Sequence, residues 1–382
     1  MSLCNSHGKR EAPIRIERVL VENYRVLRRV EFPMKPITLL LGPIGAGKST
    51  LFDVFGFLFD CFCCGLWCAW DKRGRAKEIR TRGSGGPIII EITYREQPDF
   101  PSITYHLAVN EEERGPIVEE EWLQWQRGGD PFRFLEFRRG EGWVVVGEKG
   151  EGQKVKTSLR SPDLIAVNTL GQIASYPRVA ALREFIIGWH LFCLSPADMR
   201  RQPDGGPQER LSRTGDNLPN VIRFLEERHP DRLQKIEAVV RQQVPYLSSV
   251  VTDTSLNGRL LLQSREEFFD QPIPSQFMSD GTLKMLAFLT ILYGPDPPSL
   301  IGIEEPESHL YPHLLPKLAE ECRAATEFAQ VLMSTRSLIF ASEFLPEEVL
   351  VLSRDRQGYT RITPASDIHG VRESVSYTHL RA

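Results

Sequence analysis

The chain has 382 residues, enough for one large domain or two ordinary ones with a sizeable buried core. Its hydrophobic content of 41% is that of a soluble globular protein. The formal net charge of −3 excludes a global basic field that would attract nucleic acid, so any contact with DNA would have to come from a local patch.

The cysteines and the N-terminal residues indicate the cellular compartment of the protein. Seven cysteines, an odd number without even spacing, indicate a reducing cytosol rather than a disulfide framework. The polar segment 1–13 has no apolar region of the kind that a secretory signal peptide needs. We therefore expect a cytoplasmic protein that is not bound to a membrane.

The N-terminal part predicts three strands and a helix. Segments 14–21 and 26–32 are expected to form a hairpin, and the apolar run 37–41 predicts a buried strand. This run leads directly into Gly-x-x-x-x-Gly-Lys-Ser, and the apolar residues from 51 onward predict a helix. A strand, a glycine-rich loop and a helix in this order are the context that predicts a P-loop rather than a plain glycine turn.

The residue types of this loop explain how it would bind a nucleotide. Its glycines let the backbone curl so that successive N–H groups point at one phosphate, next to the positive end of a helix. Lys48 would bring a positive charge to the β- and γ-phosphates, and Ser49 would offer a hydroxyl to Mg²⁺. The predicted nucleotide-binding residues of the loop are Gly42, Pro43, Ile44, Gly45, Ala46, Gly47, Lys48, Ser49 and Thr50.

The apolar segment 51–70 has the composition of a membrane span. It contains Asp53 and Asp60, however, and it starts at a phosphate loop that must lie in water. A core-facing helix, broken near Gly65, is the better interpretation.

The same segment carries four cysteines, which raises the alternative of a zinc or iron–sulfur site. Cys61, Cys64 and Cys68 fall on one helical face, where a thiol behaves as a small hydrophobic group. No second pair of cysteines with metal-ligand spacing and no nearby histidine accompanies them. We expect these three cysteines to pack in the core.

The most basic stretch of the chain follows at 71–82, where six lysines and arginines face two acids. A solvated loop is the ordinary interpretation, and contact with DNA backbone or nucleotide phosphate is the alternative. Strands predicted at 87–94, 102–109 and 143–146 then indicate an antiparallel β-subdomain.

From 161 onward the pattern becomes helical. Helices are predicted at 179–189, 217–227 and 231–244. Heptads sustained over three repeats are absent up to 263, so we expect a compact lid of helices rather than a long coiled-coil arm.

Two further motifs appear in the last third of the chain. Ser279 and Gly281 precede an apolar helix at 283–292, where they would form a second anion-binding helix end. The short apolar strand 299–303 ends in Glu304 and Glu305. In this Walker B arrangement the first carboxylate holds Mg²⁺ through water and the second polarises the attacking water.

Another buried strand, 330–333, ends in polar residues that include Arg336, a place for a sensor of the γ-phosphate. A helix start or a solvated strand end would explain each motif alone. Their order along the chain is very improbable by chance. We therefore expect Lys48 and Glu304 to converge on one magnesium-bound triphosphate, on neighbouring strands whose tips lie at the same end of a sheet.

With these motifs the chain resembles the ABC-type ATPase heads of the RecF/SMC group, and most of all the stand-alone ATPases of the AAA_21 and AAA_15 group. The likeness runs over 14–352. It is carried by Asn23-Tyr24-Arg25, by the segments 78–84 and 211–225, by Ser279-Asp280-Gly281-Thr282, by Ile303-Glu304-Glu305-Pro306-Glu307, and by Leu310 and Pro312.

The resemblance implies a fold and a division of the chain. The fold is an α/β P-loop NTPase with a mixed central sheet, an antiparallel β-subdomain and a helical insertion. Residues 14–160 would form a first ATPase lobe, 161–263 the helical lid and 264–366 the second lobe. The resemblance also adds Arg25 to the candidate nucleotide-binding residues.

The group's mechanism is implied as well. Two heads would dimerise around two ATP molecules, with Ser279 and Gly281 of one head touching the γ-phosphate bound to the other. Glu305 would be the general base, Lys48 would stabilise the transferring phosphoryl group, and Ser49 and Glu304 would manage Mg²⁺. The group usually has histidine where this chain has Arg336, which can bind a γ-phosphate but cannot cycle a proton, so slow hydrolysis is expected.

The leading hypothesis is an ATPase in DNA repair or anti-phage defence, with DNA or a partner nuclease encoded nearby as possible partners. A nucleotide-gated scaffold with little turnover, which regulates a partner nuclease or toxin, is a second hypothesis. A truncated OLD-type ATPase-nuclease is a third. Residues 375–382 resemble a translated sequencing adapter and are left out of the fold prediction.

Overall fold

The computed structural model describes residues 13–127, 130–147, 152–244 and 246–369. The adapter-like segment 375–382 lies outside these residues. The chain divides into two compact units, each built from segments that are distant in sequence. The first unit comprises Met1–Pro36, Asp53–Gly188 and Ser353–Ile362, and the second comprises Ile37–Phe52, Trp189–Leu352 and Thr363–Ala382.

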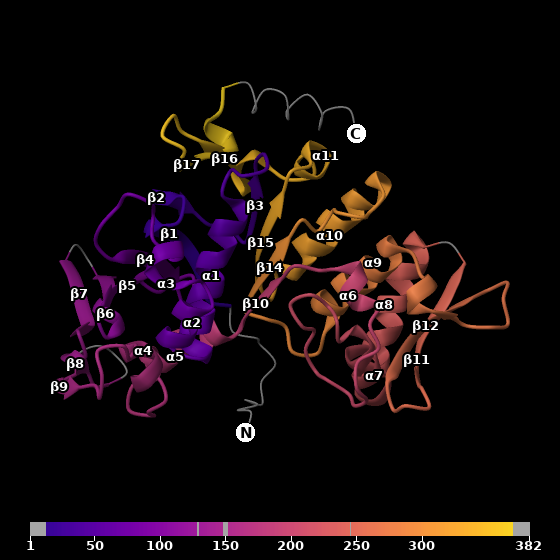
Figure 1. Ribbon diagram of the computed structural model, residues 1–382, viewed down its shortest axis with the longest axis horizontal. Coiled ribbons are helices and arrows are strands. Elements are labelled where there is room, and N and C mark those ends of the chain that lie inside the picture. The colour runs from indigo at the N-terminus through magenta and orange to yellow at the C-terminus, as the bar shows by residue number, and fades with distance from the viewer. Residues whose placement is uncertain (1–12, 128–129, 148–151, 245, 370–382) are drawn as a thin grey trace. The chain divides into compact units, whose positions relative to one another are not determined.

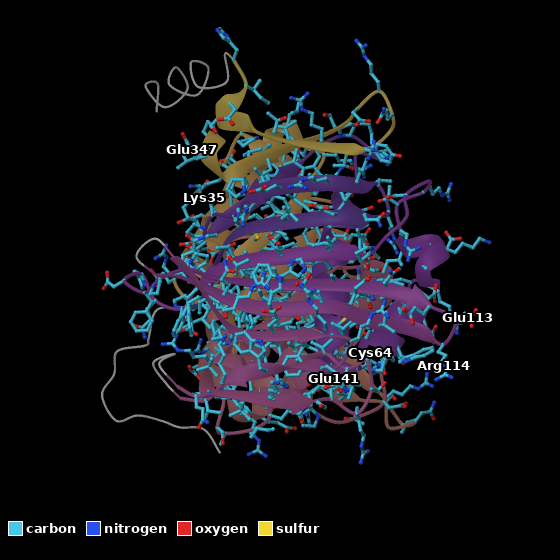
Figure 2. The ribbon with its side chains drawn as sticks, turned by 90° about the vertical axis from the view of Figure 1, so that its left-hand side faces the viewer. Lys35, Cys64, Glu113, Arg114, Glu141 and Glu347 are labelled. Atoms are coloured by element: carbon cyan, nitrogen blue, oxygen red, sulfur yellow. A yellow bond between two sulfur atoms is a disulfide. The ribbon has the colours of Figure 1, made fainter. Side chains whose placement is uncertain are left out.

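The first unit is built on an eight-stranded antiparallel sheet with the order β2-β1-β4-β5-β6-β7-β8-β9 (Figures 1 and 2). The turn between β5 and β6, with Glu113 and Arg114, projects at one edge of the view in Figure 2. Its strands are β1 (Arg15–Tyr24), β2 (Leu27–Pro33), β4 (Ile88–Arg95), β5 (Ile103–Glu112), β6 (Gly115–Arg127), β7 (Asp130–Arg138), β8 (Glu141–Val145) and β9 (Lys154–Ser158). The predicted antiparallel subdomain is confirmed, and it is larger than expected.

The long strand β6 escaped prediction because three consecutive glutamates, Glu119 to Glu121, interrupt its apolar pattern. Glu121 is nevertheless completely buried, with 0% of its surface exposed. Its carboxylate accepts hydrogen bonds from the N–H groups of Ala166 (2.6 Å) and Val167 (3.0 Å), at the start of α4 (Ala166–Leu170). The Tyr105 hydroxyl donates a third, at 3.0 Å. A buried acid is tolerated here because it satisfies donors that the helix leaves open.

We predict that Glu121→Ala lowers the free energy of unfolding by about 3 kcal/mol, because buried donors lose their acceptor. Burial raises the pKa of Glu121 from its ordinary 4.5 to about 7. The folded state therefore binds this proton more tightly, and the stability of the wild type falls as pH rises through that window, a dependence that the variant lacks. Urea unfolding at about pH 5 and about pH 8 measures both effects. Glu120→Ala, on the same strand, is the control and should lower the free energy of unfolding by less than about 1 kcal/mol. Coincident urea-unfolding curves for the wild type and Glu121→Ala would contradict the prediction.

The helices of the first unit include a break at Gly65, as predicted. Helix α1 (Lys48–Cys63) begins in the second unit and continues in the first, and α2 (Leu66–Asp71) follows after Gly65, whose φ is 87°. The helices α3 (Arg75–Ile79), α4 and α5 (Pro177–Ile187) complete the unit. The turn at Gly65 changes the direction of the chain, so the residues after it leave the helical face that a continuous helix would give them.

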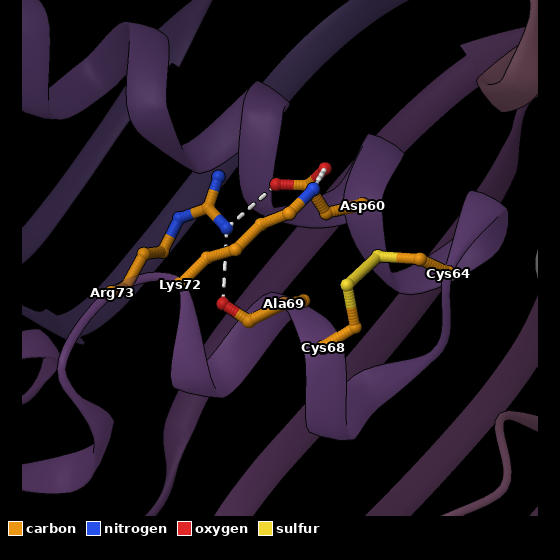
Figure 3. Close-up of a disulfide and its surroundings, with 6 residues drawn as sticks. All are labelled: Asp60, Cys64, Cys68, Ala69, Lys72 and Arg73. Carbon is orange, nitrogen blue, oxygen red and sulfur yellow. Dashed lines mark hydrogen bonds and ion pairs between the residues drawn. A yellow bond between two sulfur atoms is a disulfide. The ribbon is translucent and has the colours of Figure 1, made fainter.

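The turn at Gly65 determines where the cysteines on either side of it lie. Cys61 packs in the core as predicted, but Cys64 is exposed and forms a disulfide with the half-buried Cys68 (Figure 3). Core packing was therefore the wrong expectation for these two residues, and so was the absence of disulfides. Within the described residues, no group of three or more His, Cys, Asp or Glu side chains is arranged to hold a metal ion.

The basic stretch 71–82 is not simply a solvated loop. Arg73 is buried, and its guanidinium donates to Asp53 (2.9 Å) and Asp60 (2.8 Å) of α1. Lys72 also pairs with Asp60 at 2.8 Å (Figure 3). The two aspartates that argued against a membrane span therefore anchor this stretch. Of the helices that the structure describes, none is long and apolar enough to cross a membrane.

The second unit contains a sheet in which β10, β14, β15, β3 and β16 lie side by side in this order, all paired in parallel (Figure 1). These strands are β10 (Trp189–Phe192), β14 (Leu300–Glu304), β15 (Gln330–Thr335), β3 (Ile37–Leu41) and β16 (Val349–Arg354). The nearly continuous apolar sequence of β3, β14 and β15 is typical of strands buried on both faces. Strand β17 (Thr360–Pro364) follows β16 after a short turn.

Helices α9 (Asp280–Tyr293), α10 (Leu315–Ala325) and α11 (Leu338–Ala341) belong to the same unit. Most of α9 is buried, which explains why its sequence is apolar all round. The α/β P-loop fold with a mixed architecture of parallel and antiparallel sheets agrees with the sequence-based prediction.

The insertion contains helices, as expected, but also strands. Around α6 (Pro196–Met199), α7 (Leu218–Arg228) and α8 (Pro230–Gln243) lies a small sheet of β11 (Leu247–Thr254), β12 (Leu260–Glu266) and β13 (Ile273–Pro274). Glu237 of α8 accepts from the Val250 N–H and Glu226 of α7 from the Thr252 N–H, both at 2.8 Å. These carboxylates cover donors on β11 that would otherwise offer an open sheet edge.

Candidate active site

The site lies where three parallel strands of the second unit end. Strand β15 lies between the P-loop strand β3 and the Walker B strand β14. The expectation that β3 and β14 are neighbours was therefore wrong. Their tips nevertheless lie at the same end of the sheet, because Glu304 is level with Ser334 and Leu41 is level with Thr335.

The end of β15 ties the two motifs together through its backbone. The Gly42 N–H donates to the Thr335 carbonyl at 3.3 Å, and the Glu305 N–H donates to the Ser334 carbonyl at 2.9 Å. The glycine loop and the pair of acids are therefore held by adjacent residues of one buried strand.

The glycine loop has the conformation that its residue types predicted. Gly45 and Gly47 have φ of 79° and 104°, a region that favours glycine. Gly42 is required for a different reason, since a Cβ there would lie 2.6 Å from the Leu352 carbonyl oxygen on β16. Helix α1 begins directly at Lys48, so its open N–H groups lie under the loop.

Lys48 is buried at this helix start and folds back over the loop. Its Nζ donates to the carbonyls of Gly42 (2.6 Å) and Pro43 (3.1 Å), and Ser49 beside it is exposed. Burial lowers the pKa of Lys48, and Arg336 adds to this, while the carboxylates of Glu305, Glu307 and Glu304 act in the opposite direction. The predicted acids and the predicted arginine therefore all act on Lys48 within this unit.

An arginine side chain lies beside each of the two acids, Glu304 and Glu305. Arg213 lies with Nη2 3.6 Å from Glu304 Oε1, and Arg336 with Nη2 3.4 Å from Glu305 Oε2. Glu305 has φ of 45°, in the left-handed region that is rare for a residue with a side chain. Such backbone strain concentrates at functional sites.

Glu307 lies two residues further along the same turn. Thr335 donates a short hydrogen bond to its Oε1, while its Oε2 is buried without a hydrogen-bond partner among the described residues. A buried acceptor without a partner is unusual in a native structure, and this one lies in the same turn as Glu304 and Glu305.

The signature segment forms its predicted helix start. The Ser279 hydroxyl accepts from the Thr282 N–H at 3.1 Å and caps α9. The neighbouring Asp280 pairs with Arg200 at 2.6 Å and with His309 at 3.2 Å. A Cβ at Gly281 would lie 3.2 Å from the His309 carbonyl oxygen, a tight contact that favours glycine here.

Sequence reasoning overlooked Lys284, which follows the signature segment on α9. Its side chain is 1% exposed, and its Nζ donates to the Glu305 carbonyl at 2.7 Å and to the Ser308 hydroxyl. Burial lowers the pKa of Lys284 to about 8, although nearby Glu307, Cys193 and Glu305 oppose the change. A single lysine within an otherwise apolar helix was the available signal. Arg213 gave no such signal, because its position depends on how a loop returns to β10.

Arg25 belongs to the first unit, whereas the residues described above belong to the second. Its Nη1 pairs with Asp53 Oδ2 at 3.0 Å. It also lines a cleft of about 560 Å³ within that unit, together with Arg80, Arg82 and Arg354. The contact of Arg25 with nucleotide therefore stays a prediction.

The donors at the second unit's site fit a magnesium ion. Ser49 offers a hydroxyl and Glu304 a carboxylate, and Mg²⁺ takes few protein oxygens while it keeps several waters. The guanidinium of Arg213 lies beside Glu304, which shows that a cation can reach this carboxylate. The residues present therefore fit the ion that ATP chemistry requires.

Known structures give a fold for comparison. The chain is similar to an SMC head bound to the C-terminal winged-helix domain of ScpA, with 10% identity, a TM-score of 0.56, and coverage of 91% of this chain and 97% of that one. It is also similar to a Pyrococcus furiosus SMC head with an extended coiled coil, bound to the C-terminal domain of ScpA. That match has 11% identity, a TM-score of 0.52, and coverage of 97% and 100%.

No curated protein sequence matches the chain. The model of one family does, over residues 37–342, which include the P-loop, the signature segment, the two acids and Arg336. This match covers well over half of the chain, and the solved heads share its fold. The chain therefore belongs to the AAA_21 family, described as "AAA domain, putative AbiEii toxin, Type IV TA system", and it has the P-loop fold of an ABC/SMC-type ATPase head.

Proposed function

We propose that this protein is a magnesium-dependent ATPase that hydrolyses ATP with water as the nucleophile. The observation that carries the proposal is the arrangement of the second unit, where the glycine loop and the two acids are joined through adjacent residues of β15. A phosphate cradle, a buried lysine and a pair of carboxylates at one sheet edge are the parts that phosphoryl transfer requires.

The roles follow from chemistry and position. Residues 42–50 bind the phosphates, and Lys48 exchanges the Gly42 and Pro43 carbonyls for phosphate oxygens. Ser49 and Glu304 hold Mg²⁺, which when bound neutralises charge on the β- and γ-phosphates. Glu305 accepts the proton of the attacking water, and Arg336 stabilises charge on the γ-phosphate.

We further propose that two copies pair when ATP binds, with Ser279 and Gly281 of each copy completing the site of the other. Large apolar residues are exposed beside the predicted motifs of the second unit, where such an interface would cover them. They are Ile44 of the P-loop (83% exposed), Tyr311, Leu338 and Ile339. The solved SMC heads are bound to a ScpA domain, and by analogy a partner protein is proposed here too.

The cellular role is proposed to be anti-phage defence or DNA repair. The family description names a toxin and a type IV toxin–antitoxin system, which favours defence. The arginines of the first unit's cleft supply the local basic patch that contact with DNA backbone or nucleotide phosphate would need, despite the net negative charge of the chain.

One observation favours the nucleotide-gated scaffold as a second candidate. Arg336 pairs with Glu305, the proposed general base, and cannot take part in proton transfer. Phosphate release and nucleotide affinity, measured on the same preparation, separate the two functions. Steady turnover of Mg-ATP with ATP-dependent dimers in size-exclusion chromatography supports the enzyme. Tight ATP binding without phosphate release supports the scaffold.

We predict that Arg336→Ala lowers kcat by about 100-fold, because the transition state loses a charged donor. The Arg336 side chain is 54% exposed, so the free energy of unfolding should change by less than about 1 kcal/mol. Phosphate release and thermal melting are measured together, with Arg323→Ala as a control at a distant ion pair with Glu348. If Arg336 only restrains Glu305, kcat should instead rise.

A further inference from the structure

Lys284 joins the signature helix to the backbone of the proposed general base. It lies on α9, five residues after Ser279, and its Nζ donates to the carbonyl oxygen of Glu305 at 2.7 Å. The same ammonium contacts the Ser308 hydroxyl, which itself donates to the Glu305 carbonyl at 2.9 Å. The Ser308 N–H reaches that carbonyl too, at 3.1 Å. One carbonyl oxygen is thus the centre of a compact turn.

This turn needs support because its first residue has an unfavourable backbone. Glu305 has a left-handed φ of 45°, a conformation that is unfavourable for a residue with a Cβ. Its N–H is fixed to the Ser334 carbonyl of β15, and its carbonyl is fixed by Lys284. Holding both ends of the residue sets the direction in which its carboxylate leaves the sheet edge.

Both acceptors of the Lys284 ammonium are uncharged, although the group is buried. A buried charge without an opposite charge in contact costs stability, so a purely structural position would favour an apolar side chain of the same length. A lysine that is buried here in spite of this cost, with its ammonium on the backbone of the proposed general base, points to a functional requirement.

We propose that Lys284 is a positioning residue, which fixes the Glu305–Ser308 turn and thereby aims the Glu305 carboxylate at the attacking water. Because Lys284 and Ser279 lie on one rigid helix, a displacement of the signature segment by a bound phosphate is passed to Glu305 of the same chain. The inference rests on the proposed ATPase function for its catalytic part, and on the described contacts for its structural part.

The test replaces Lys284 by Met, which has a similar length and no donor. We expect kcat of Mg-ATP hydrolysis to fall at least about 30-fold, while the affinity for nucleotide stays within about threefold, because a misplaced catalytic group slows chemistry without loosening the phosphates. The variant should melt no lower than the wild type, since the Glu305 carbonyl keeps its Ser308 donors. A slower but equally stable protein excludes unfolding as the cause.

Hydrogen exchange provides a readout that does not depend on hydrolysis. In Lys284→Met, the amides of Ser308 and Leu310 should exchange at least about tenfold faster than in the wild type. Thr290→Val, a buried substitution on the same helix away from the turn, is the matched control and should change neither exchange nor kcat. If Lys284→Met fails to fold, Ser308→Ala replaces it, with a smaller change expected in the same direction.

The outcomes are distinct. If the wild type shows no Lys48-dependent hydrolysis, the proposed ATPase function fails, while the exchange rates still decide whether Lys284 holds the turn. If the wild type hydrolyses ATP and Lys284→Met retains kcat within threefold, or if its exchange rates are unchanged, the inference is overturned. An equal loss of nucleotide affinity and kcat would also overturn it, because it would indicate damage to the phosphate loop.

Discussion

Glu305→Gln is expected to lower the turnover of Mg-ATP by at least about 1000-fold and to accumulate a dimer that retains ATP. The amide has the shape of the carboxylate but cannot accept the proton of the attacking water, and general base catalysis contributes roughly 10²–10⁴ in rate. The backbone N–H and carbonyl of residue 305 keep their partners on β15 and α9. Only the chemical step should therefore be lost.

Phosphate release measures the first effect, and size-exclusion chromatography with and without Mg-ATP measures the second. The exposed Glu347, changed to Gln, is the control in the same unit and should behave as the wild type. The ion pair between Glu305 and Arg336 is partly exposed, so its loss should change the free energy of unfolding by less than about 1 kcal/mol. Turnover within threefold of the wild type would exclude Glu305 as the general base.

The site residues that could be predicted are those that belong to a short, contiguous sequence motif. The glycine loop has a strand before it and a helix after it, and the two acids follow an apolar strand directly. Local pattern therefore identified the ends of β3, β14 and β15. It could not give the order of these strands, because pairing between distant segments depends on the whole fold, and so the position of β15 between the other two was missed.

The wrong predictions outside the site also come from contacts between distant parts of the chain. Strand β6 was missed because Glu121 breaks the apolar alternation, and only the position of α4 explains why an acid is buried there. Cys64 and Cys68 were assigned to one helical face because a continuous helix was extended through Gly65. Arg73 was grouped with solvated charges, whereas it lies in a turn and pairs with Asp53 and Asp60 of α1. In each case a contact between separate elements overrides the local preference.

Lys284 is a functional candidate that the sequence pattern alone indicates. A charge within an otherwise buried helix is expensive, so its presence predicts either a partner or a task. The sequence contains this signal but not the partner, since the Glu305 carbonyl reaches Lys284 only when β14 and α9 are packed. The order of the motifs along the chain therefore predicts which parts form the site, whereas their coupling has to come from the structure.

Lys48→Ala is the second variant with a large expected effect, and its effect on nucleotide binding can be measured separately from its effect on hydrolysis. The ammonium that now donates to two loop carbonyls would otherwise donate to phosphate oxygens, and such charged hydrogen bonds contribute about 2 kcal/mol or more. We expect the affinity for ATP to fall about 30-fold or more. Lys235→Ala, an exposed lysine on α8, is the control and should leave the affinity unchanged.

The lysine also predicts how ATP affinity depends on pH. Because burial lowers the pKa of Lys48 in the free protein, the ammonium loses its proton at a lower pH than an exposed lysine does. The affinity of the wild type should therefore decline as pH rises from about 7 to about 10, whereas the already weakened Lys48→Ala variant should show no such decline. Nucleotide titrations at both pH values measure this difference. Parallel pH profiles for the two proteins, or equal affinities at neutral pH, would mean that Lys48 does not contact the phosphates, and the glycine loop would then lose its assignment as the nucleotide site.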